Sequence, residues 1–437
     1  MRIVGMAFAV AIMSTGLASA QLPTCGLPLQ PKCTQCRDGV DNDFDALTDL
    51  ADPGCSSAAD NYEGDDPAPD VGGTADVDID PRTTRKPFGF NTGLSSWNWE
   101  PPAPHSGITV EQEAELIRNV GGNAQRIGIQ WSAVEPAPGQ YDESKLAWVD
   151  AMEAELRAHG MRAIIIVWES PMWATDLCPI SDLCIVQQQR FAPPRDIAAY
   201  AKFLAWIAQR YPEAVIETWN EPNIKGFWKG TVWPDASRMA KMQCAAYDAI
   251  KAVNPSTTVL APGLAYVGPG ASKEAYLYLD FMRSLYQKMG RICWDALSVH
   301  IYQGTSVDGP NSYAAQAFRV IRNLRAQYGD TTPIWITETG ATTSGSYGGD
   351  HGHTRRTPEQ QRDINRAAVN EYLSTPEVGA VILHTLRDRP IWEGQFSDPA
   401  KIEYGFGLLY DGNGPTPLPK PGYCHFVEMI GGEYPGC

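Results

Sequence analysis

Two glutamates stand where apolar, strand-like runs of the chain end. The run "AVIETWNE" ends at Glu221, between Asn220 and Pro222, and "PIWITETG" presents Glu338 in a similar way. A carboxylate at the rim of a buried strand costs desolvation free energy unless something uses it, and the proline prevents a paired strand from continuing. Two carboxyl groups at one site could cleave a glycosidic bond, because one can protonate the leaving oxygen while the other attacks the sugar or activates water.

Other chemistry-bearing side chains follow further strand-like runs. Arg126 could keep Glu338 ionised, and Tyr302 could orient it by a hydrogen bond, while His300 precedes Tyr302 on the same run. The tryptophan-rich surroundings of Glu221 suit a carboxyl group that must hold a proton near neutral pH, because an apolar site disfavours the charged form. The competing interpretation is that both glutamates cap helices or form ion pairs, which is weak for two of them at such positions.

The elements that must position these residues alternate regularly along the chain. Eight strand-like segments begin near residues 88, 124, 162, 214, 258, 296, 333 and 380, and helical spacing covers 109–121, 143–160, 196–210, 235–252, 272–289, 312–328 and 358–373. Such β–α units predict an α/β fold, a (β/α)₈ TIM barrel whose active site lies at the carboxyl ends of the strands. The alternative, an open doubly wound sheet, usually has a glycine-rich loop after its first strand. Here the first strand continues as "FNTGLSSWNW".

Tryptophans are numerous in the loops expected above the barrel. Trp97, Trp99, Trp173, Trp228 and Trp233 lie there. Aromatic faces bind the apolar faces of sugar rings, so these side chains are candidate substrate contacts. The alternative is that most of them cover the core.

The paired motifs resemble those of a known clan. "WNEPN" and "WITETG" are similar to the acid/base and nucleophile motifs of retaining glycoside hydrolases on (β/α)₈ barrels, and "QWSAVEPAPGQYD", "SPMWA", "AIKAVNP" and "FGLLYDG" are similar to bacterial endoglycosidases of family 39, with family 5 cellulase-like enzymes next. The resemblance spans about residues 88–425. It implies that Glu221 is the general acid/base and Glu338 the nucleophile, that Asn220 contacts the sugar 2-hydroxyl, and that Arg126, His300 and Tyr302 surround the nucleophile.

The resemblance also carries one departure. Relatives often have Trp-Tyr near the end of the eighth strand, under the sugar whose bond is cut, whereas this chain has Leu383-His384. The platform is then expected from elsewhere, with Trp392 as the candidate. About 50 residues follow the eighth strand, fewer than the β-sandwich of exo-acting β-xylosidases needs, which favours an open groove and endo cleavage. The alternatives are a transglycosylase with the same residues and a noncatalytic glycan-binding barrel.

The amino-terminal part differs in composition from the rest. Residues 1–20 have the arginine, the short apolar stretch and the A-x-A ending of a signal peptide, which predicts a secreted protein with no membrane association after cleavage. Residues 21–84 form an acidic, cysteine-containing module and linker, with 14 acidic and 2 basic residues between 21 and 80, and residues 85–437 form the hydrolase domain. No basic stripe exists, so nucleic acid is not an expected partner. The expected partner is a polysaccharide or oligosaccharide, and the chain is expected to be a monomer.

Ten cysteines fit an oxidising compartment and predict disulfides. Grouping by proximity gives Cys25, Cys33, Cys36 and Cys55, then Cys178 with Cys184, Cys244 with Cys293, and Cys424 with Cys437.

The run "DNDFDALTD" lies between two of these cysteines and places Asp41, Asp43, Asp45 and Asp49 at a spacing that suits Ca²⁺. It resembles short calcium-binding repeats of secreted bacterial proteins, except that Phe44 and Ala46 replace two glycines. A structural calcium and a solvated acidic turn are both compatible with this run, and no cofactor is expected for catalysis.

Overall fold

The computed structural model describes residues 78–91, 108–175, 190–229, 234–267, 278–302, 313–344, 355–388, 404–410 and 416–437. The chain divides into two compact units, Met1–Pro67 and Ala68–Cys437. The first unit lies outside the described residues, and so do the predicted signal peptide, the four aspartates of the possible calcium site and the cysteines before Cys244. The second unit contains all the elements that follow.

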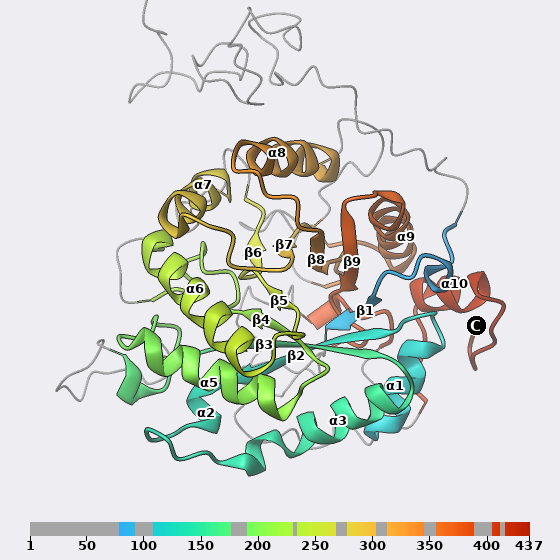
Figure 1. Cartoon of the computed structure of the whole chain (residues 1–437). Helices are drawn as coiled ribbons and strands as arrows, with labels where there is room; N and C mark the ends of the chain where they lie inside the picture. Colours follow the sequence, from blue (N-terminus) through green and yellow to red (C-terminus); the bar gives the residue numbers. More distant parts are fainter. Residues whose placement is uncertain are drawn as a thin grey trace, which may run out of the picture. The chain divides into compact units, whose positions relative to one another are not determined.

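A closed ring of parallel strands forms the centre of this unit (Figure 1). The order of the nine strands is β5-β4-β3-β2-β1-β9-β8-β7-β6. Their bounds are β1 (Phe88–Asn91), β2 (Ala124–Gln130), β3 (Arg162–Trp168), β4 (Val215–Thr218), β5 (Val259–Leu260), β6 (Leu264–Ala265), β7 (Leu297–His300), β8 (Ile334–Thr339) and β9 (Val378–Leu383).

The two ends of this order are pieces of one predicted strand. The fifth strand, which is expected to begin near residue 258, is interrupted at Pro262 and Gly263, and this leaves β5 and β6. Proline lacks the N–H that a ladder needs. The ring closes because Leu260 bridges Ala296, whose carbonyl oxygen accepts a hydrogen bond from the Ala261 N–H at 2.9 Å. The predicted (β/α)₈ barrel is therefore confirmed, with its fifth strand broken.

Helices surround the ring of strands (Figure 1). They are α1 (Val110–Arg118), α2 (Trp131–Val134), α3 (Ala147–Ala158), α5 (Ile197–Arg210), α6 (Ala236–Val253), α7 (Tyr278–Met289), α8 (Tyr313–Gln327), α9 (Pro358–Ser374) and α10 (Pro421–Met429). Local chemistry starts and stops them: Thr357 and Gln360 form a capping box before α9 with Pro358 at the first turn, and Gly160 takes a positive φ of 67° after α3. Among these described helices, α2 and α10 were not predicted.

The barrel interior is layered. An apolar plug fills its lower part, made of Ala124, Ile164, Val215, Leu260, Ala296, Trp335, Ala380 and Ile382. A separate and larger apolar core lies between the strands and the helices. Nearer the carboxyl ends of the strands the inward-facing side chains become polar, beginning with Arg126 and Glu217, which form an ion pair. The plug therefore supports a polar upper half.

The chain leaves β4 in an irregular path. The strand was predicted to run to Glu221, but it ends at Thr218. Trp219 and Glu221 then adopt positive φ angles of 54° and 40°, values that are uncommon and strained for residues other than glycine. This path breaks the alternation of a strand, so Trp219 turns into the apolar core while Glu221 faces the centre of the ring.

Two disulfides lie in the described chain, and both match the predicted pairs. Cys244 in α6 is bonded to Cys293, just before β7, and Cys424 in α10 is bonded to Cys437. The sequence separations are 49 and 13 residues.

Removing the Cys244–Cys293 disulfide, which closes the longer loop, should destabilise the protein more than removing Cys424–Cys437. Chain entropy assigns about 4 kcal/mol to the Cys244–Cys293 bridge and about 3 kcal/mol to the shorter one. We expect the Cys244→Ser/Cys293→Ser pair to lower the midpoint of thermal unfolding more than Cys424→Ser/Cys437→Ser does. Peptide mapping without reduction should recover both linked peptides. Alkylation of these four cysteines in the unreduced native protein would contradict the assignment.

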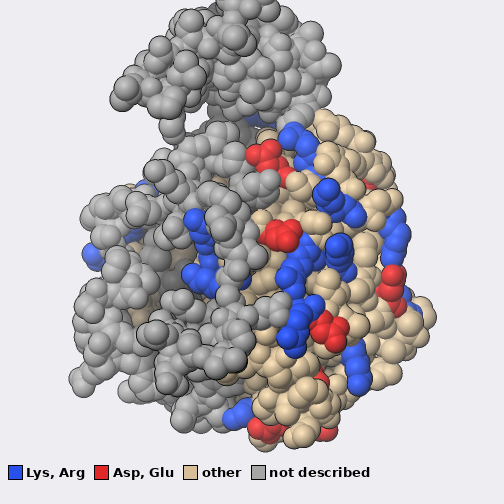
Figure 2. Space-filling view, turned by 90° about the vertical axis from the view of Figure 1, so that its left-hand side faces the viewer, with Lys and Arg blue, Asp and Glu red and all other residues tan. Residues whose placement is uncertain are grey.

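The described surface carries mixed charge. On the face shown in Figure 2, Lys and Arg side chains are interspersed with Asp and Glu. Ion pairs at the surface of the described chain include the exposed pair Arg291 with Asp248 and the partly buried Arg210 with exposed Glu143. Among the helices that the structure describes, none combines the length and the apolar character needed to cross a membrane.

Candidate active site

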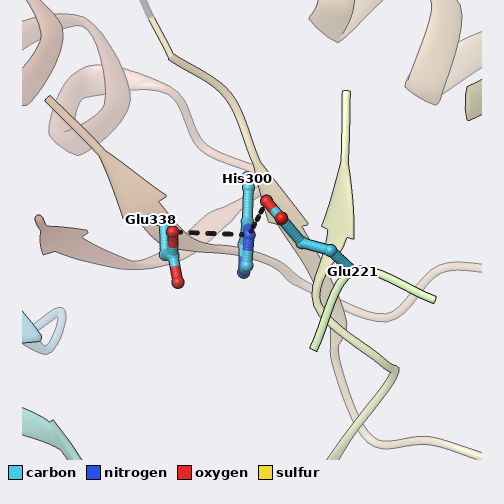
Figure 3. A group of neighbouring side chains, drawn as sticks. All are labelled: Glu221, His300 and Glu338. Carbon is cyan, nitrogen blue, oxygen red and sulfur yellow. Dashed lines mark hydrogen bonds and ion pairs between the residues drawn. The ribbon is translucent and has the colours of Figure 1, made fainter. Parts of the chain in front are cut away.

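Glu221, His300 and Glu338 meet at the carboxyl ends of the strands. His300 lies between the two glutamates (Figure 3), with its Nδ1 atom 2.8 Å from Glu221 Oε1 and 3.6 Å from Glu338 Oε2. One carboxylate oxygen from each glutamate and a ring nitrogen of His300 all lie within 4.8 Å of one another. The glutamate side chains are 13% and 12% exposed, whereas that of His300 is 0% exposed. The two carboxyl groups can therefore meet a ligand, and the histidine supports them from beneath.

Arg126 of β2 connects this group to its surroundings. Its Nη1 donates to Glu338 Oε1 at 2.7 Å and to Asn91 Oδ1 at 3.1 Å. Its Nη2 donates to Asn220 Oδ1 at 3.1 Å. Because that oxygen is engaged, the amide N–H groups are what Asn220 can offer to a ligand hydroxyl. The sheet register explains the meeting, since Asn91 pairs with Arg126 across β1 and β2.

The ionised form of Glu338 is strongly favoured. Tyr302 donates its hydroxyl to Oε2 at 2.6 Å, and His384 Nδ1 lies 4.0 Å from the same oxygen. Burial alone would raise the pKa of Glu338, but the charges of His300, Arg126 and His384, with the Tyr302 hydrogen bond, lower this pKa well below its ordinary value. A carboxylate that stays ionised in a partly buried position is suited to act as a nucleophile.

His300 contacts both an acidic and a basic group of the site. Its Nδ1 lies 2.8 Å from Glu221 Oε1, and its Nε2 lies 3.5 Å from Arg126 Nη2. Burial alone would lower the pKa of His300, but the carboxylates of Glu338 and Glu221 outweigh it and raise the pKa. The His300 contact holds one oxygen of Glu221, whose side chain is 13% exposed.

A second polar layer lies beneath these groups, and the sequence did not reveal it. The Glu217 carboxylate accepts hydrogen bonds from Arg126 Nε at 2.5 Å, Ser298 Oγ at 2.6 Å and Thr337 Oγ1 at 3.1 Å. Its side chain is 0% exposed. The available signal was a charged residue inside the apolar run "AVIETW", because a buried strand admits a carboxylate only when a partner satisfies it.

Comparison with known proteins identifies the family of this chain. The model of the family "Cellulase (glycosyl hydrolase family 5)" matches residues 81–372. The chain belongs to glycosyl hydrolase family 5. It is a glycosidase of the (β/α)₈ clan that the sequence motifs indicated. The expected membership of this clan is confirmed, and the matching family model is that of family 5, the second of the two families that the motifs resemble.

Sequence and structure relatives of this family 5 chain are distant. A "Beta-galactosidase" from Pyrococcus woesei is 25% identical over 187 residues, which cover 31% of this chain and 37% of that protein. A family 39 glycoside hydrolase from Bacteroides cellulosilyticus WH2 is 20% identical with a TM-score of 0.51, covering 81% of this chain and 64% of the other. A monomeric beta-xylosidase from Caulobacter crescentus CB15 is 19% identical with a TM-score of 0.54, covering 81% and 69%. The chain thus spans less than two thirds of the first two relatives, and the structural matches show the fold.

Glu169, another glutamate at the carboxyl end of a strand, has no exposed side-chain surface. It follows β3 with a positive φ of 61°, and its side chain is 0% exposed, 3.7 Å from Arg190 Nε. Gln130 and Ser132 donate to it at 3.4 Å. Burial raises its pKa to about 8. A group without exposed surface cannot protonate a substrate oxygen, so Glu169 is a poor alternative to Glu221.

The predicted sugar-stacking tryptophans divide into three groups. Trp228 is 1% exposed and packs against Trp219 with ring centroids 5.9 Å apart, so the prediction that it contacts substrate is not supported, because its faces are covered by the core. Trp173 is partly buried, and its indole N–H donates to the Glu135 carbonyl oxygen at 2.9 Å. Trp97, Trp99, Trp233 and Trp392 lie outside the described residues.

Metal ligands are available at one place in the described part of the hydrolase. Glu221, His300 and Glu338 are the set of three close acidic or histidine side chains there. The Arg126 guanidinium contacts one of these glutamates and opposes a cation. The positive charge of Arg126 beside Glu338 therefore disfavours a bound cation at this place.

Proposed function

We propose that this glycosidase cleaves β-linked polysaccharide internally, with retention of anomeric configuration, and acts outside the cell. The observation that carries the mechanism is the close approach of Glu221 and Glu338, with oxygens within 4.8 Å. Retaining enzymes hold their carboxyl groups about 5–5.5 Å apart, whereas inverting enzymes need about 6.5–9.5 Å to admit a water. The names of the matched family and of its relatives, cellulase, beta-galactosidase and beta-xylosidase, support β-linked substrates.

The reaction proceeds by double displacement. A Glu338 oxygen attacks the anomeric carbon while Glu221 gives its proton to the leaving oxygen, so the glycosidic C–O bond breaks as the glycosyl-enzyme ester forms. Glu221 then removes a proton from water, whose oxygen attacks the same carbon and releases Glu338. The low pKa of Glu338 supports the role of nucleophile, and the short His300 contact holds Glu221 in position. The amide of Asn220 would donate to the sugar 2-hydroxyl.

Secretion is supported by two kinds of observation. Residues 1–20 have the pattern of a signal peptide, and the disulfides Cys244–Cys293 and Cys424–Cys437 are compatible with an extracellular protein. Internal cleavage is the activity that the family name cellulase suggests.

A substrate panel tests this proposal. Carboxymethylcellulose, barley β-glucan, xylan and mannan would be assayed for reducing ends and viscosity, beside 2,4-dinitrophenyl β-glycosides of cellobiose, glucose, xylose and galactose. We expect viscosity to fall before many reducing ends appear, and NMR to show the β anomer first. A first-formed α anomer would contradict retention, longer oligosaccharides would indicate a transglycosylase, and binding without products would indicate a noncatalytic barrel. The Glu221→Gln/Glu338→Gln protein controls for contaminating hydrolases.

A further inference from the structure

Glu217 is a buried carboxylate that the proposed reaction does not use directly. It lies in β4, four residues before Glu221, and its side chain is 0% exposed. No sugar can reach it. A buried charge is tolerated only when it is paired and hydrogen-bonded, so any effect of Glu217 on the reaction must pass through its partners.

The partners of Glu217 lie on the strands that carry the reacting groups. Oε2 accepts from Arg126 Nε in β2, and Oε1 accepts from Ser298 in β7 and Thr337 in β8. Ser298 precedes the site histidine by two residues, and Thr337 directly precedes the nucleophile. One carboxylate therefore ties β2, β4, β7 and β8 together just beneath the site.

The hydrogen bond from Arg126 Nε to Glu217 also fixes the direction in which the rest of the guanidinium points. A guanidinium is planar, and its N–H donors have fixed relative directions. When Glu217 holds Nε, the two remaining nitrogens of Arg126 must point as they do, toward Glu338 at 2.7 Å and Asn220 at 3.1 Å. A carboxylate placed elsewhere would turn the guanidinium away from the nucleophile.

The chain leaves room for this arrangement at Gly263. A Cβ atom there would lie 2.7 Å from Glu217 Oε1 and 2.6 Å from His300 Nε2, closer than real contacts allow. The residue lies between β5 and β6, and its carbonyl oxygen accepts the Glu221 N–H at 2.7 Å. The missing side chain at Gly263 is an observation independent of the ion pair, and it concerns the same Glu217 carboxylate.

We propose that Glu217 is a positioning residue, which holds Arg126 in the orientation that aims and stabilises the Glu338 carboxylate. The inference rests on the proposed function, because it assigns Glu338 as the nucleophile. It predicts that Glu217 matters for catalysis only as long as Arg126 is present.

A double-mutant cycle tests that dependence. With the dinitrophenyl β-glycoside that the wild type cleaves fastest, Glu217→Gln should lower kcat about 10²-fold, the cost of a misplaced reacting group, with little change in KM. In the Arg126→Leu background the same substitution should change kcat less than about 3-fold, because the two positions are then uncoupled. The same loss in both backgrounds would overturn the proposal. If the wild type cleaves no glycoside, the proposed function itself fails.

A second variant keeps the test open if Glu217→Gln does not fold. Glu217→Asp keeps the charge but withdraws it by one methylene, drawing Arg126 away from Glu338. The pKa of Glu338, which His300, Arg126 and His384 hold low against burial, should rise. The nucleophile must be ionised, so the acid limb of kcat/KM should move to higher pH and activity should be lost earlier on acidification. Reduced activity with an unmoved acid limb would indicate a merely structural role and overturn the proposal.

A matched control comes from another buried glutamate. Glu113 of α1 is 8% exposed and accepts a hydrogen bond from Gln125 Nε2 at 2.7 Å, outside the described contacts of the site. Glu113→Gln should leave both kcat and the acid limb unchanged, so a general effect of altering a buried carboxylate would be recognised.

Discussion

Glu338→Gly should abolish turnover of the natural substrate while leaving the fold intact. Without the carboxylate no glycosyl-enzyme can form, and loss of a nucleophile typically costs on the order of 10⁵-fold or more in kcat. Arg126 keeps its partner Glu217 in this variant, so no buried cation is left unpaired and the barrel should remain folded. Near-UV circular dichroism and the unfolding midpoint would verify this.

Azide provides the positive half of that experiment. The glycine leaves a space beside Arg126 and Tyr302, the two groups that hold the carboxylate oxygens. Azide bound there should attack the anomeric carbon of a dinitrophenyl β-glycoside, forming a C–N bond as the phenolate leaves. The expected product is the α-glycosyl azide, with inverted configuration. Activity retained without azide, or a β-glycosyl azide, would remove Glu338 from the role of nucleophile.

The barrel could be predicted from sequence because its signals are local. Apolar runs and helical spacing alternate at nearly even intervals, and each helix between two parallel strands returns the chain to the same side. The break in the fifth strand follows from Pro262, which lacks the N–H that a strand ladder needs. The real end of β4 at Thr218 could not be predicted, because positive φ at Trp219 and Glu221 is imposed by the surrounding packing and not by their residue types.

The residues of the candidate site were likewise predictable only where a local sequence pattern marks them. Residues at strand ends were identifiable, since parallel strands bring their carboxyl ends to one rim. Glu217 was missed because its main partner, Arg126, lies 91 residues away, and no local pattern joins the two. Trp228 was misassigned for a related reason: residue type shows that an aromatic side chain can bind a sugar, but only tertiary packing decides whether its face is open.

Glu221→Ala should separate substrates by their leaving groups. A poor leaving group needs a proton as the glycosidic bond breaks, so its cleavage should slow by about 10²–10⁴-fold, the usual contribution of general acid catalysis. A dinitrophenolate needs little protonation, so the first step with that substrate should survive. Deglycosylation lacks its base, so the glycosyl-enzyme should accumulate and be detectable by intact mass. Azide should release it as the β-glycosyl azide, because the second attack inverts again.

Two further measurements complete the test of Glu221. They are the pH dependence of Glu221→Ala and the behaviour of a control variant at Glu169. The proton that Glu221 supplies is needed only in glycosylation of poor substrates, so the basic limb of that step should flatten in Glu221→Ala. Glu169→Gln is the matched control: its side chain is 0% exposed, so it should leave the dependence of rate on leaving-group pKa unchanged. If Glu221→Ala slowed good and poor substrates equally with an unchanged basic limb, Glu221 would position the substrate without protonating it. The short contact between His300 and Glu221 would then orient a binding group, and the acid would have to come from a residue outside this cluster.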